Sequence, residues 1–526
     1  MVLAKQVSQN PRELADKIVK EILERKPGEV SIIEVAGPGF INFHLSPEFF
    51  ILQNKEILKA GKKFGLNKNL KGQKTTVEYT DPNPFKEFHI GHLMSNSIGE
   101  AIARIVEANG AKVKRACYQG DVGLHVAKAI WGMKNMKGNI KDASDLGKAY
   151  AYGASSYEDE KVKQEIIQIN KEIYEHSNKE LEKLYKKGRK ISLEYFESIY
   201  KILGTKFDNY FFESETGEFG KKIVQENMGK VFEKGDNNTA IFRGENFGLH
   251  TRVFINSEGL PTYEAKELGL AKIKYNKTKY DKSIVITGNE VNEYFKVLLK
   301  AMSLIFPELA LKTSHISHGM LRLPEGKMSS RTGKVITAES LLDAIKEKIT
   351  EKMTDRGMSN KEKSEAIEKV AVGALKYSIL KQVNGKDIIF DFDKSISFEG
   401  DSGPYLQYSY ARAKSIVRYA KEEGVKSKIS PSQIKSQFDG ASITILEKML
   451  YRFPEVVERA GNEYSPHYIA TYLIELASSF NSFYAQGKIV DKTDTKSPYK
   501  VALTEAFSVT LKNGLNILGI QAPEKM

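Results

Sequence analysis

Cysteine and tryptophan are almost absent from the sequence, which has one residue of each among 526. The single cysteine, Cys117, excludes an intramolecular disulfide and any zinc site built from clustered cysteines. No apolar run approaches the roughly 20 residues that a membrane-spanning helix requires. The opening residues, MVLAKQVSQNPRELADK, contain no basic segment followed by an apolar stretch and a cleavage site, so we expect no secretory signal. These absences favour a cytoplasmic protein without a membrane partner.

Positive charge, by contrast, is in excess. The 80 lysines and arginines outnumber 67 acidic residues, which gives a net charge of +13 at pH 7 and a pI near 9.2. A polyanionic partner would explain this balance, because basic side chains gain free energy when they displace counterions from phosphates. A lysine-rich proteome would explain it equally well. The length exceeds what one hydrophobic core organises, so we expect roughly two to four domains.

Sequence periodicity divides the chain into three predicted domains. Residues 1–70 combine a helical pattern with two strand-like runs around a Gly-Pro-Gly turn, which indicates a small α+β domain. Residues 71–345 alternate strand-like and helical runs, and a long charged helical stretch predicts an insertion at about 145–235. Residues 346–526 are rich in tyrosine and almost wholly helical in pattern, which predicts an all-α domain.

The central region begins with a strand, a helix and a second strand in close succession. Residues 74–80 are β-rich, a helical apolar stripe covers residues 91–109, and KVKRAC then resumes the β-character. Such a unit joins parallel strands, so we predict an α/β fold with a Rossmann-like, doubly wound sheet. Strand-like runs resume after the insertion at residues 252–256, 284–288 and 315–319.

The junction between the first strand and its helix carries the sequence His89-Ile90-Gly91-His92. A helix N-terminus offers unpaired N–H groups and a positive dipole end, which favour phosphate. Two histidines three residues apart can donate there to phosphate oxygens of ATP. Gly91 leaves space for the close approach of an adenine or a ribose. The alternative is a surface helix start with incidental histidines, which this position directly after a β-run disfavours.

A second segment, residues 323–334, follows the last strand-like run and is basic, glycine-punctuated and rich in hydroxyl groups. Its core reads Lys327-Met328-Ser329-Ser330-Arg331. Positive charge on a loop that closes over a triphosphate would stabilise the transition state and the departing pyrophosphate. By itself the segment is weak evidence, because basic loops are usually solvated surface.

Together the two segments resemble the HIGH and KMSKS motifs of class I aminoacyl-tRNA synthetases. Over nearly the whole chain the pattern resembles the arginyl-tRNA synthetases in particular. Ser330 stands where the general motif has its second lysine, and Lys86 stands three residues before the first histidine of HIGH, as is common in arginine enzymes. The resemblance implies a Rossmann-like catalytic domain, an N-terminal tRNA-recognition domain that this chain enters part-way, and a helical anticodon-binding domain.

The resemblance also implies an arginine pocket. Glu78, Asp81 and Asn83 match positions that hold the ammonium and carboxylate ends of the substrate. Tyr263 and Glu267 match a pair that receives the guanidinium, and their i, i+4 spacing puts both on one helical face. A carboxylate can meet the guanidinium fork with two hydrogen bonds. In isolation, such a pair is ordinary on a helix. The expected ATP contacts are His89, His92, Gly288, Glu290, Lys327 and Met328, and the expected catalytic set is Lys86, His89, Gly91, His92, Lys327, Ser329 and Arg331.

Two further stretches resemble the tRNA-binding parts of the family. EGDSGPYLQY at residues 399–408 matches the entry to the anticodon-binding domain, and LKNGLNILGIQAPEKM matches the family C-terminus. The resemblance places anticodon bases against aromatic side chains, a usual route to recognition of single-stranded RNA. Without it, tyrosines at three-residue spacing are more often core. The expected tRNA contacts are Tyr405, Tyr408, Tyr484 and Met526, with Phe40 and Asn42 for the D-loop.

The implied reaction is the activation of L-arginine by ATP and its transfer to the 3′-terminal adenosine of tRNA(Arg), with the tRNA required in the first step. It further implies Mg²⁺ bridging the phosphates, no resident metal or tightly bound cofactor, and a monomer. The departures from the family pattern are Val122 and His125 in place of Trp and Gln, Glu267 in place of Asp, and Val291 in place of Gln. Three alternatives remain: another class I synthetase, such as the cysteinyl or glutamyl enzyme, a small nucleotidyltransferase that uses HxGH, and a non-catalytic RNA-binding protein.

Overall fold

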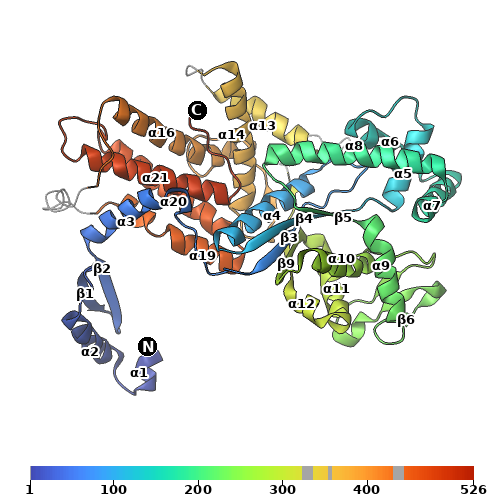
Figure 1. Ribbon diagram of the computed structural model, residues 1–526, viewed down its shortest axis with the longest axis horizontal. Helices are drawn as coiled ribbons and strands as arrows, with labels where there is room; N and C mark the ends of the chain where they lie inside the picture. Colours follow the sequence, from blue (N-terminus) through green and yellow to red (C-terminus); the bar gives the residue numbers. More distant parts are fainter. Residues whose placement is uncertain (1, 323–335, 354–357, 430–442) are drawn as a thin grey trace.

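The computed structural model describes residues 2–322, 336–353, 358–429 and 443–526. Figure 1 shows a central sheet, a helical region on the C-terminal side, two groups of elements on the opposite side, and a small N-terminal unit that projects away from the rest. Among the residues in these ranges, no helix combines the length and the apolar character needed to cross a membrane.

The N-terminal unit is a two-stranded antiparallel hairpin covered on one face by a helix. Its small core contains Val19, Val30 and Ile33 and is separate from the other cores. Gly39 makes the turn with φ at +117°, and a Cβ there would lie 2.6 Å from the carbonyl oxygen of Pro11. The elements are α1 (Val2–Gln6), α2 (Pro11–Glu24), β1 (Val30–Ala36) and β2 (Phe40–Leu45).

The central sheet has five strands, all parallel, in the order β10-β9-β3-β4-β5. Helix α4 (Ile90–Ala108) connects β3 to β4, which forms the predicted βαβ unit and confirms the Rossmann-like fold class. The strands are β3 (Lys74–Glu78), β4 (Lys112–Gln119), β5 (Asn209–Phe212), β9 (Lys282–Gly288) and β10 (Thr313–His318).

Two strands differ from the sequence-based reading. β5 lies inside the stretch 145–235 that was expected to be an insertion, yet it pairs with β4 as an edge strand of the main sheet. It has only four residues, which is too short for a visible alternation of apolar and polar positions. Conversely, the run at 252–256 forms β8 (Arg252–Ile255) of a separate antiparallel sheet with β6 (Glu233–Lys234) and β7 (Ala240–Phe242).

Two groups of helices adjoin the central sheet on the side away from the C-terminal region (Figure 1). One group packs around its own core, which includes Phe85, Val126 and Ile166, and α8 runs from this group back to the sheet (Figure 1). It comprises α5 (Leu124–Asn135), α6 (Ala143–Ser156), α7 (Glu160–Glu175) and α8 (Lys179–Leu203). The other group comprises α9 (Glu213–Glu226), α10 (Tyr263–Thr278), α11 (Asn292–Ile305), α12 (Pro307–Lys312) and the short η2 (Asp236–Asn238), η3 (Gly244–Phe247) and η4 (Asn289–Val291).

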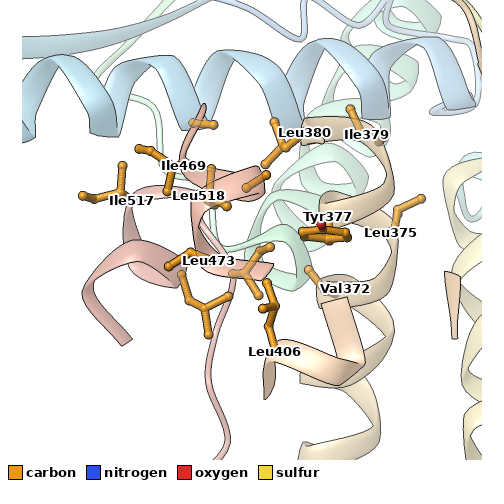
Figure 2. Close-up of a cluster of buried hydrophobic side chains, with 14 of the residues drawn as sticks. Val372, Leu375, Tyr377, Ile379, Leu380, Leu406, Ile469, Leu473, Ile517 and Leu518 are labelled. Atoms are coloured by element: carbon orange, nitrogen blue, oxygen red, sulfur yellow. The ribbon is translucent and has the colours of Figure 1, made fainter. Parts of the chain in front are cut away.

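The C-terminal region is helical, as predicted. Figure 2 shows apolar side chains from α14, α16, α20 and α21 gathered in one cluster, which includes Tyr377, Leu406, Leu473 and Leu518. Its elements are β11 (Leu321–Arg322), α13 (Ala338–Lys352), α14 (Asn360–Leu380), β12 (Ile388–Ile389), α15 (Phe392–Ser395), α16 (Gly403–Glu422), α18 (Ile445–Leu450), α19 (Phe453–Glu463), α20 (His467–Ala485) and α21 (Ser497–Ile517).

The helix α3 (Pro47–Ala60) and the turn η1 (Gly61–Lys63) join this helical region rather than the N-terminal unit. The amide of Asn54 donates to the hydroxyl of Tyr499 at 3.1 Å, and the amide of Asn513 donates to the carbonyl oxygen of Gly61 at 2.9 Å. The N-terminal unit therefore ends at about residue 45, where β2 ends.

Two cationic side chains, the buried Lys376 of α14 and the partly exposed Arg104 of α4, connect the sheet domain to the helical region. The ammonium of Lys376 donates to the carbonyl oxygens of Leu203 at 2.7 Å and Gly519 at 2.9 Å. Arg104 of α4 donates to the carbonyl oxygen of Asn516 at 3.0 Å. Because these carbonyls lie at the ends of α8 and α21, one cluster of contacts joins the sheet domain, the first helical group and the C-terminal helices.

Candidate active site

The loop between β3 and α4 holds three non-glycine residues at positive φ: Thr80 at 81°, Asp81 at 45° and Phe85 at 69°. Such conformations cost on the order of 1–3 kcal/mol each and persist only where the surroundings hold them. The N–H of Thr80 donates to the hydroxyl of Ser95 on α4 at 2.9 Å, and that of Phe85 donates to Ser192 on α8 at 2.8 Å. The loop is therefore held from both sides, by α4 and by α8.

The two histidines of the HIGH segment have defined tautomers. Nδ1 of His89 accepts the N–H of Gly91 at 3.1 Å, and Nδ1 of His92 accepts the N–H of His89 at 3.3 Å. Burial, with a contribution from Lys86, lowers the pKa of His89 and places that of His92 well below its usual value. Both rings are therefore neutral with hydrogen on Nε2, and they stack with their centroids 3.6 Å apart. This arrangement leaves two N–H donors at the start of α4.

Lys86 and the end of β9 face the same histidines. The charge of Lys86 lowers the pKa of both histidines, and its ammonium lies 5.0 Å from the ring centroid of Tyr150. Glu290 opposes this effect on His89, so its carboxylate also faces the start of α4. A Cβ on Gly288 would collide with that carboxylate. The structure thus brings the predicted residues of the two parallel strand ends, β3 and β9, to one place.

The predicted residues Lys327, Met328, Ser329 and Arg331 lie outside the described residues, as does Ser330. The chain that follows them is held against the HIGH segment. The N–H of Ile90 donates to the carbonyl oxygen of Ile336 at 3.3 Å, and the N–H of Ala338 donates to that of Phe88 at 2.8 Å. Thr337 pairs with His89 as an isolated antiparallel bridge.

A carboxylate cluster, consisting of Glu78, Asp81, Glu213 and Glu267, lies at the carboxyl ends of β3 and β4. Glu78 is buried and forms an ion pair of 2.6 Å with Lys274 of α10. Asp81 accepts the N–H of Tyr118 at 2.7 Å. Burial, followed by the charge of Glu78, raises the pKa of Asp81 well above its usual value, and Glu267 adds to this rise.

Glu267 differs from the other members of the carboxylate cluster because its carboxyl group forms no ion pair and no hydrogen bond with any described residue. Burial, followed by the charge of Glu78, raises its pKa to about 8. Tyr263 begins α10 one turn earlier and lies at the rim, with 61% of its surface exposed. The structure therefore places Glu267 beside Glu78 and Asp81, and Tyr263 at the outer edge of the same region.

Asn83 also reaches the carboxylate cluster. A Cβ on Gly120, at the end of β4, would collide with the amide oxygen of Asn83 and would lie 3.2 Å from a carboxylate oxygen of Glu213. Asn83 and Glu213 therefore meet at the same point of the backbone. Glu213 had no part in the sequence-based site, because nothing local marks its link to the pocket, which runs through Lys266, 53 residues later.

The predicted tRNA contacts fall in two places. Tyr405, Tyr408 and Met526 line an aromatic cavity of about 520 Å³ together with Arg412 and Asn481. A second cavity of about 450 Å³ is lined by Tyr408, Arg412, Tyr484 and Met526. The two cavities share Tyr408, Arg412 and Met526. The structure therefore brings together all four predicted C-terminal residues, Tyr405, Tyr408, Tyr484 and Met526.

Arg412 and Asn481 were missed by the sequence reading and connect the aromatic residues. The guanidinium of Arg412 lies 4.7 Å from the ring centroid of Tyr408 and 5.0 Å from that of Tyr484. The amide of Asn481 donates to the hydroxyl of Tyr405 at 2.9 Å. The i, i+4 spacing of Tyr408 and Arg412 was the available signal for Arg412.

Phe40 and Asn42 lie elsewhere, at alternate positions of β2. Figure 1 shows β2 in the N-terminal unit that projects away from the rest of the molecule. Phe40 has 64% of its surface exposed, and Asn42 is exposed beside Glu34 of the paired strand. They are therefore available to a large partner and remote from the carboxylate cluster in the chain fold.

Comparison with known proteins identifies the family. Residues 53–392 match the catalytic domain of class I tRNA synthetases (R), residues 406–526 a DALR anticodon binding domain, and residues 1–45 an arginyl tRNA synthetase N terminal domain. The arginine--tRNA ligase of Clostridium kluyveri is 31% identical over 98% of this chain and 90% of its own length. That of Treponema denticola is 30% identical, over 99% and 91%. The chain belongs to the arginyl-tRNA synthetase family.

Solved structures agree on the fold of this arginyl-tRNA synthetase family member. The arginyl-tRNA synthetase of Thermus thermophilus superimposes with a TM-score of 0.78 over 100% of this chain and 93% of that one, at 24% sequence identity. The resemblance predicted from the HIGH and KMSSR segments is confirmed at the level of family, fold class and reaction type.

The departures from the synthetase pattern have identifiable surroundings. Val122 is buried in the core around Phe85. His125 donates from Nε2 to the carbonyl oxygen of Gly120 at 2.9 Å, and burial lowers its pKa to about 3, so it is a neutral ring in a loop that borders the pocket. Val291 packs at the edge of the core between α10 and α11.

Proposed function

We propose that this chain activates L-arginine with ATP and transfers it to the 3′-terminal adenosine of tRNA(Arg), releasing AMP and pyrophosphate. The observation that carries the proposal is the position of Glu267. It is a buried carboxyl group without an ion-pair partner among the described residues, at the same end of the central sheet as the β3–α4 loop that leads to the N–H donors of His89 and His92. Membership of the arginyl-tRNA synthetase family supports the same assignment.

In the first step, a carboxylate oxygen of arginine attacks the α-phosphate of ATP. A new oxygen–phosphorus bond forms, the bond to the β-phosphate breaks, and pyrophosphate leaves with the bonding electron pair. His89 and His92 donate from Nε2 to phosphate oxygens, and Lys86 offsets the negative charge that builds up. Gly91 leaves room for the nucleotide, and Gly288 and Glu290 border it on the β9 side. Mg²⁺ enters with ATP as part of the substrate and bridges phosphate oxygens.

The segment with Lys327, Met328, Ser329 and Arg331 is assigned to the same step. Its basic residues would stabilise the leaving pyrophosphate, and Lys86 would supply the charge that Ser330 lacks. The attachment of Ile336 and Ala338 to the HIGH segment supports this assignment, because the chain directly after the segment is hydrogen-bonded beside His89.

Different sets of residues hold the two ends of arginine. Asn83, Glu78 and Asp81 face the ammonium and carboxylate end, and the flat carboxylate of Glu267 accepts two hydrogen bonds from the guanidinium. Tyr263 at the rim covers the guanidinium plane. Positioning of this kind supplies the rate without a protein nucleophile.

In the second step, the 2′-hydroxyl of the terminal adenosine attacks the carbonyl carbon of arginyl-adenylate, and AMP leaves. The tRNA is bound at a distance through Tyr405, Tyr408, Tyr484 and Met526, whose rings and side chains accept unstacked anticodon bases. Phe40 and Asn42 contact the D-loop. The family pattern further suggests a cytoplasmic monomer that needs bound tRNA for the first step.

The decisive assay is ATP–pyrophosphate exchange with arginine, with and without tRNA(Arg). We expect exchange only when arginine and the tRNA are both present. Exchange with a different amino acid alone would refute the arginine assignment. A protein that binds tRNA(Arg) but supports no exchange under any condition would be a non-catalytic RNA-binding protein instead.

A further inference from the structure

The C-terminal end of helix α13 lies at the aromatic cavity. Its last residue, Lys352, and the following residue, Met353, line the cavity of about 520 Å³ that also contains Tyr405, Tyr408 and Met526. Lys352 is exposed, whereas Met353 is buried and belongs to the main core. Neither residue has a role in the steps described above. An exposed ammonium beside aromatic rings suits the phosphate of a nucleotide whose base is stacked there.

The N-terminal end of α13 is attached to the HIGH segment. Thr337, the N-cap of the helix, pairs with His89 as an isolated antiparallel bridge. The N–H of Ala338, the first residue of the helix, donates to the carbonyl oxygen of Phe88 at 2.8 Å. The start of α13 is therefore fixed beside His89, which is a proposed phosphate donor.

Between these two ends, α13 is one continuous helix with a buried apolar face. It has 15 residues, which gives a length of about 22 Å. Leu341, Leu342, Ile345 and Ile349 are buried and pack in the same core as apolar side chains of α4 and α14. Figure 1 shows the helix extending from the C-terminal helices towards α8. Because packed interiors transmit strain, a change at one end of such a helix affects the other end.

We propose that Lys352 and Met353 are positioning residues for adenylate formation, which act through α13 on the HIGH segment. When anticodon nucleotides occupy the aromatic cavity, Lys352 binds a phosphate and Met353 packs against a base, which fixes the C-terminal end of the helix. The N-terminal end of the helix then holds His89 in the orientation from which Nε2 donates to ATP. This inference rests on the proposed function, and it supplies a route by which bound tRNA promotes the first step.

The first test is Lys352→Ala, measured by ATP–pyrophosphate exchange with arginine over a range of tRNA(Arg) concentrations. A residue that only binds tRNA changes the KM for tRNA, whereas a positioning residue also changes kcat at saturating tRNA. We expect this kcat to fall by about tenfold and the KM for arginine to stay unchanged. Lys348→Ala is the matched control, because it removes the same charge one turn earlier on α13 and outside the cavity. It should behave like the unchanged protein.

The second test changes the RNA instead of the protein. Each anticodon nucleotide of tRNA(Arg) is replaced in turn by an abasic residue, and exchange is measured at saturating tRNA. In the unchanged protein, loss of the base that occupies the cavity should lower kcat by about tenfold. In Lys352→Ala the same abasic tRNA should cause little further loss, because both changes interrupt one route. Losses that multiply would show two independent routes and would contradict the inference.

The third test changes the helix between the two sites. Glu347 is exposed near the middle of α13 and lies outside the cavity. Glu347→Gly weakens the helix, whereas Glu347→Ala preserves it. At saturating tRNA, the kcat of Glu347→Gly should be about fivefold below that of Glu347→Ala, and both variants should bind tRNA(Arg) like the unchanged protein.

The inference is overturned if Lys352→Ala keeps its kcat at saturating tRNA and loses only affinity for tRNA, which would make Lys352 a binding residue alone. It is also overturned if Lys348→Ala lowers kcat equally, or if Glu347→Gly matches Glu347→Ala. Failure of the proposed function is recognised separately. The unchanged protein would then show no arginine-dependent exchange with tRNA(Arg), and the inference would fall with it.

Discussion

The carboxylate cluster below Tyr263 and the aromatic cavity beside Met526 differ in how their charges are arranged. In the cluster, Glu78 and Glu213 are buried and already paired with lysines at 2.6 Å, which leaves Glu267 available. In the cavity, Arg412 lies between exposed or half-buried rings and forms no ion pair with any described carboxylate. The first arrangement suits one small cation, and the second suits stacked bases that carry phosphates.

We expect this difference in charge arrangement to separate the proposed tasks of the two regions. Removal of one charge from a buried cluster with fixed partners should be strongly unfavourable, because the remaining charge is unpaired and cannot be hydrated. An open aromatic surface changes in smaller steps, because each ring contributes its own contact. Substitutions in the two regions should therefore affect different kinetic constants by different amounts.

The largest effect is expected at the proposed phosphate donors, His89 and His92. His89→Ala or His92→Ala should lower the rate of adenylate formation by about 10²-fold, because a neutral N–H donor to the transition state is lost. Lys86→Ala should lower the same rate far more than tRNA affinity. Exchange kinetics and a tRNA-binding assay measure the two. His250→Ala, which alters an exposed histidine, is the matched control, and an unchanged rate in the His89 and His92 variants would remove them from the catalytic set.

Glu267→Gln should raise the KM for arginine by about 10- to 100-fold, because the guanidinium loses a charge-assisted pair of hydrogen bonds. Glu267→Asp keeps the charge and should retain most of the affinity. Steady-state exchange as a function of arginine concentration distinguishes them. If both variants bind arginine like the unchanged protein, the guanidinium is held elsewhere.

Tyr484→Ala should weaken binding of tRNA(Arg) by about tenfold, as expected for the loss of one stacked base, and leave the KM for arginine unchanged. Tyr152→Ala is a suitable control, since Tyr152 on α6 is similarly exposed and lies outside both cavities. Filter binding or fluorescence anisotropy measures the tRNA affinity. An equal loss of arginine and tRNA binding would indicate misfolding and would remove the contrast between the regions.

The smallest expected effect is the release of a proton when arginine binds. The pKa of Glu267 is about 8, so its carboxyl is largely protonated at pH 7, whereas a bound guanidinium favours the ionised form. Burial raises this pKa above its usual value of 4.5, so the protonated form of Glu267 contributes to the stability of the protein without ligand. This contribution to stability is lost as the pH rises through 8. Arginine binding should therefore release close to one proton at pH 7 and almost none at pH 9.

Calorimetry in two buffers with different ionisation enthalpies measures this release. Glu267→Gln has no such proton and should show none at either pH. Release that persists unchanged in Glu267→Gln would assign the proton to another group, such as Asp81, whose pKa is also raised.

Much of this organisation could be read from local sequence signals. The HIGH segment follows a β-run and starts a helix, so the sequence alone placed His89 and His92 at a helix N-terminus, and apolar periodicity predicted the parallel sheet and the helical C-terminus. Strand β5 was not predicted because its four residues show no alternation of apolar and polar positions. Strand β8 was predicted in the main sheet because a strand-like pattern does not indicate which strand it pairs with.

The charge pairing of the pocket could not be predicted in the same way. Lys274 and Glu78 are 196 residues apart, and Lys266 and Glu213 are 53 apart, so no spacing rule connects them. The sequence identified Glu267 by family position, whereas only the fold distinguishes it from its paired neighbours.

The most direct measurement is a crystal structure of this protein with arginine bound. We predict guanidinium nitrogens within about 3 Å of the carboxylate oxygens of Glu267. A guanidinium that makes no contact with Glu267 would contradict the assignment of the pocket.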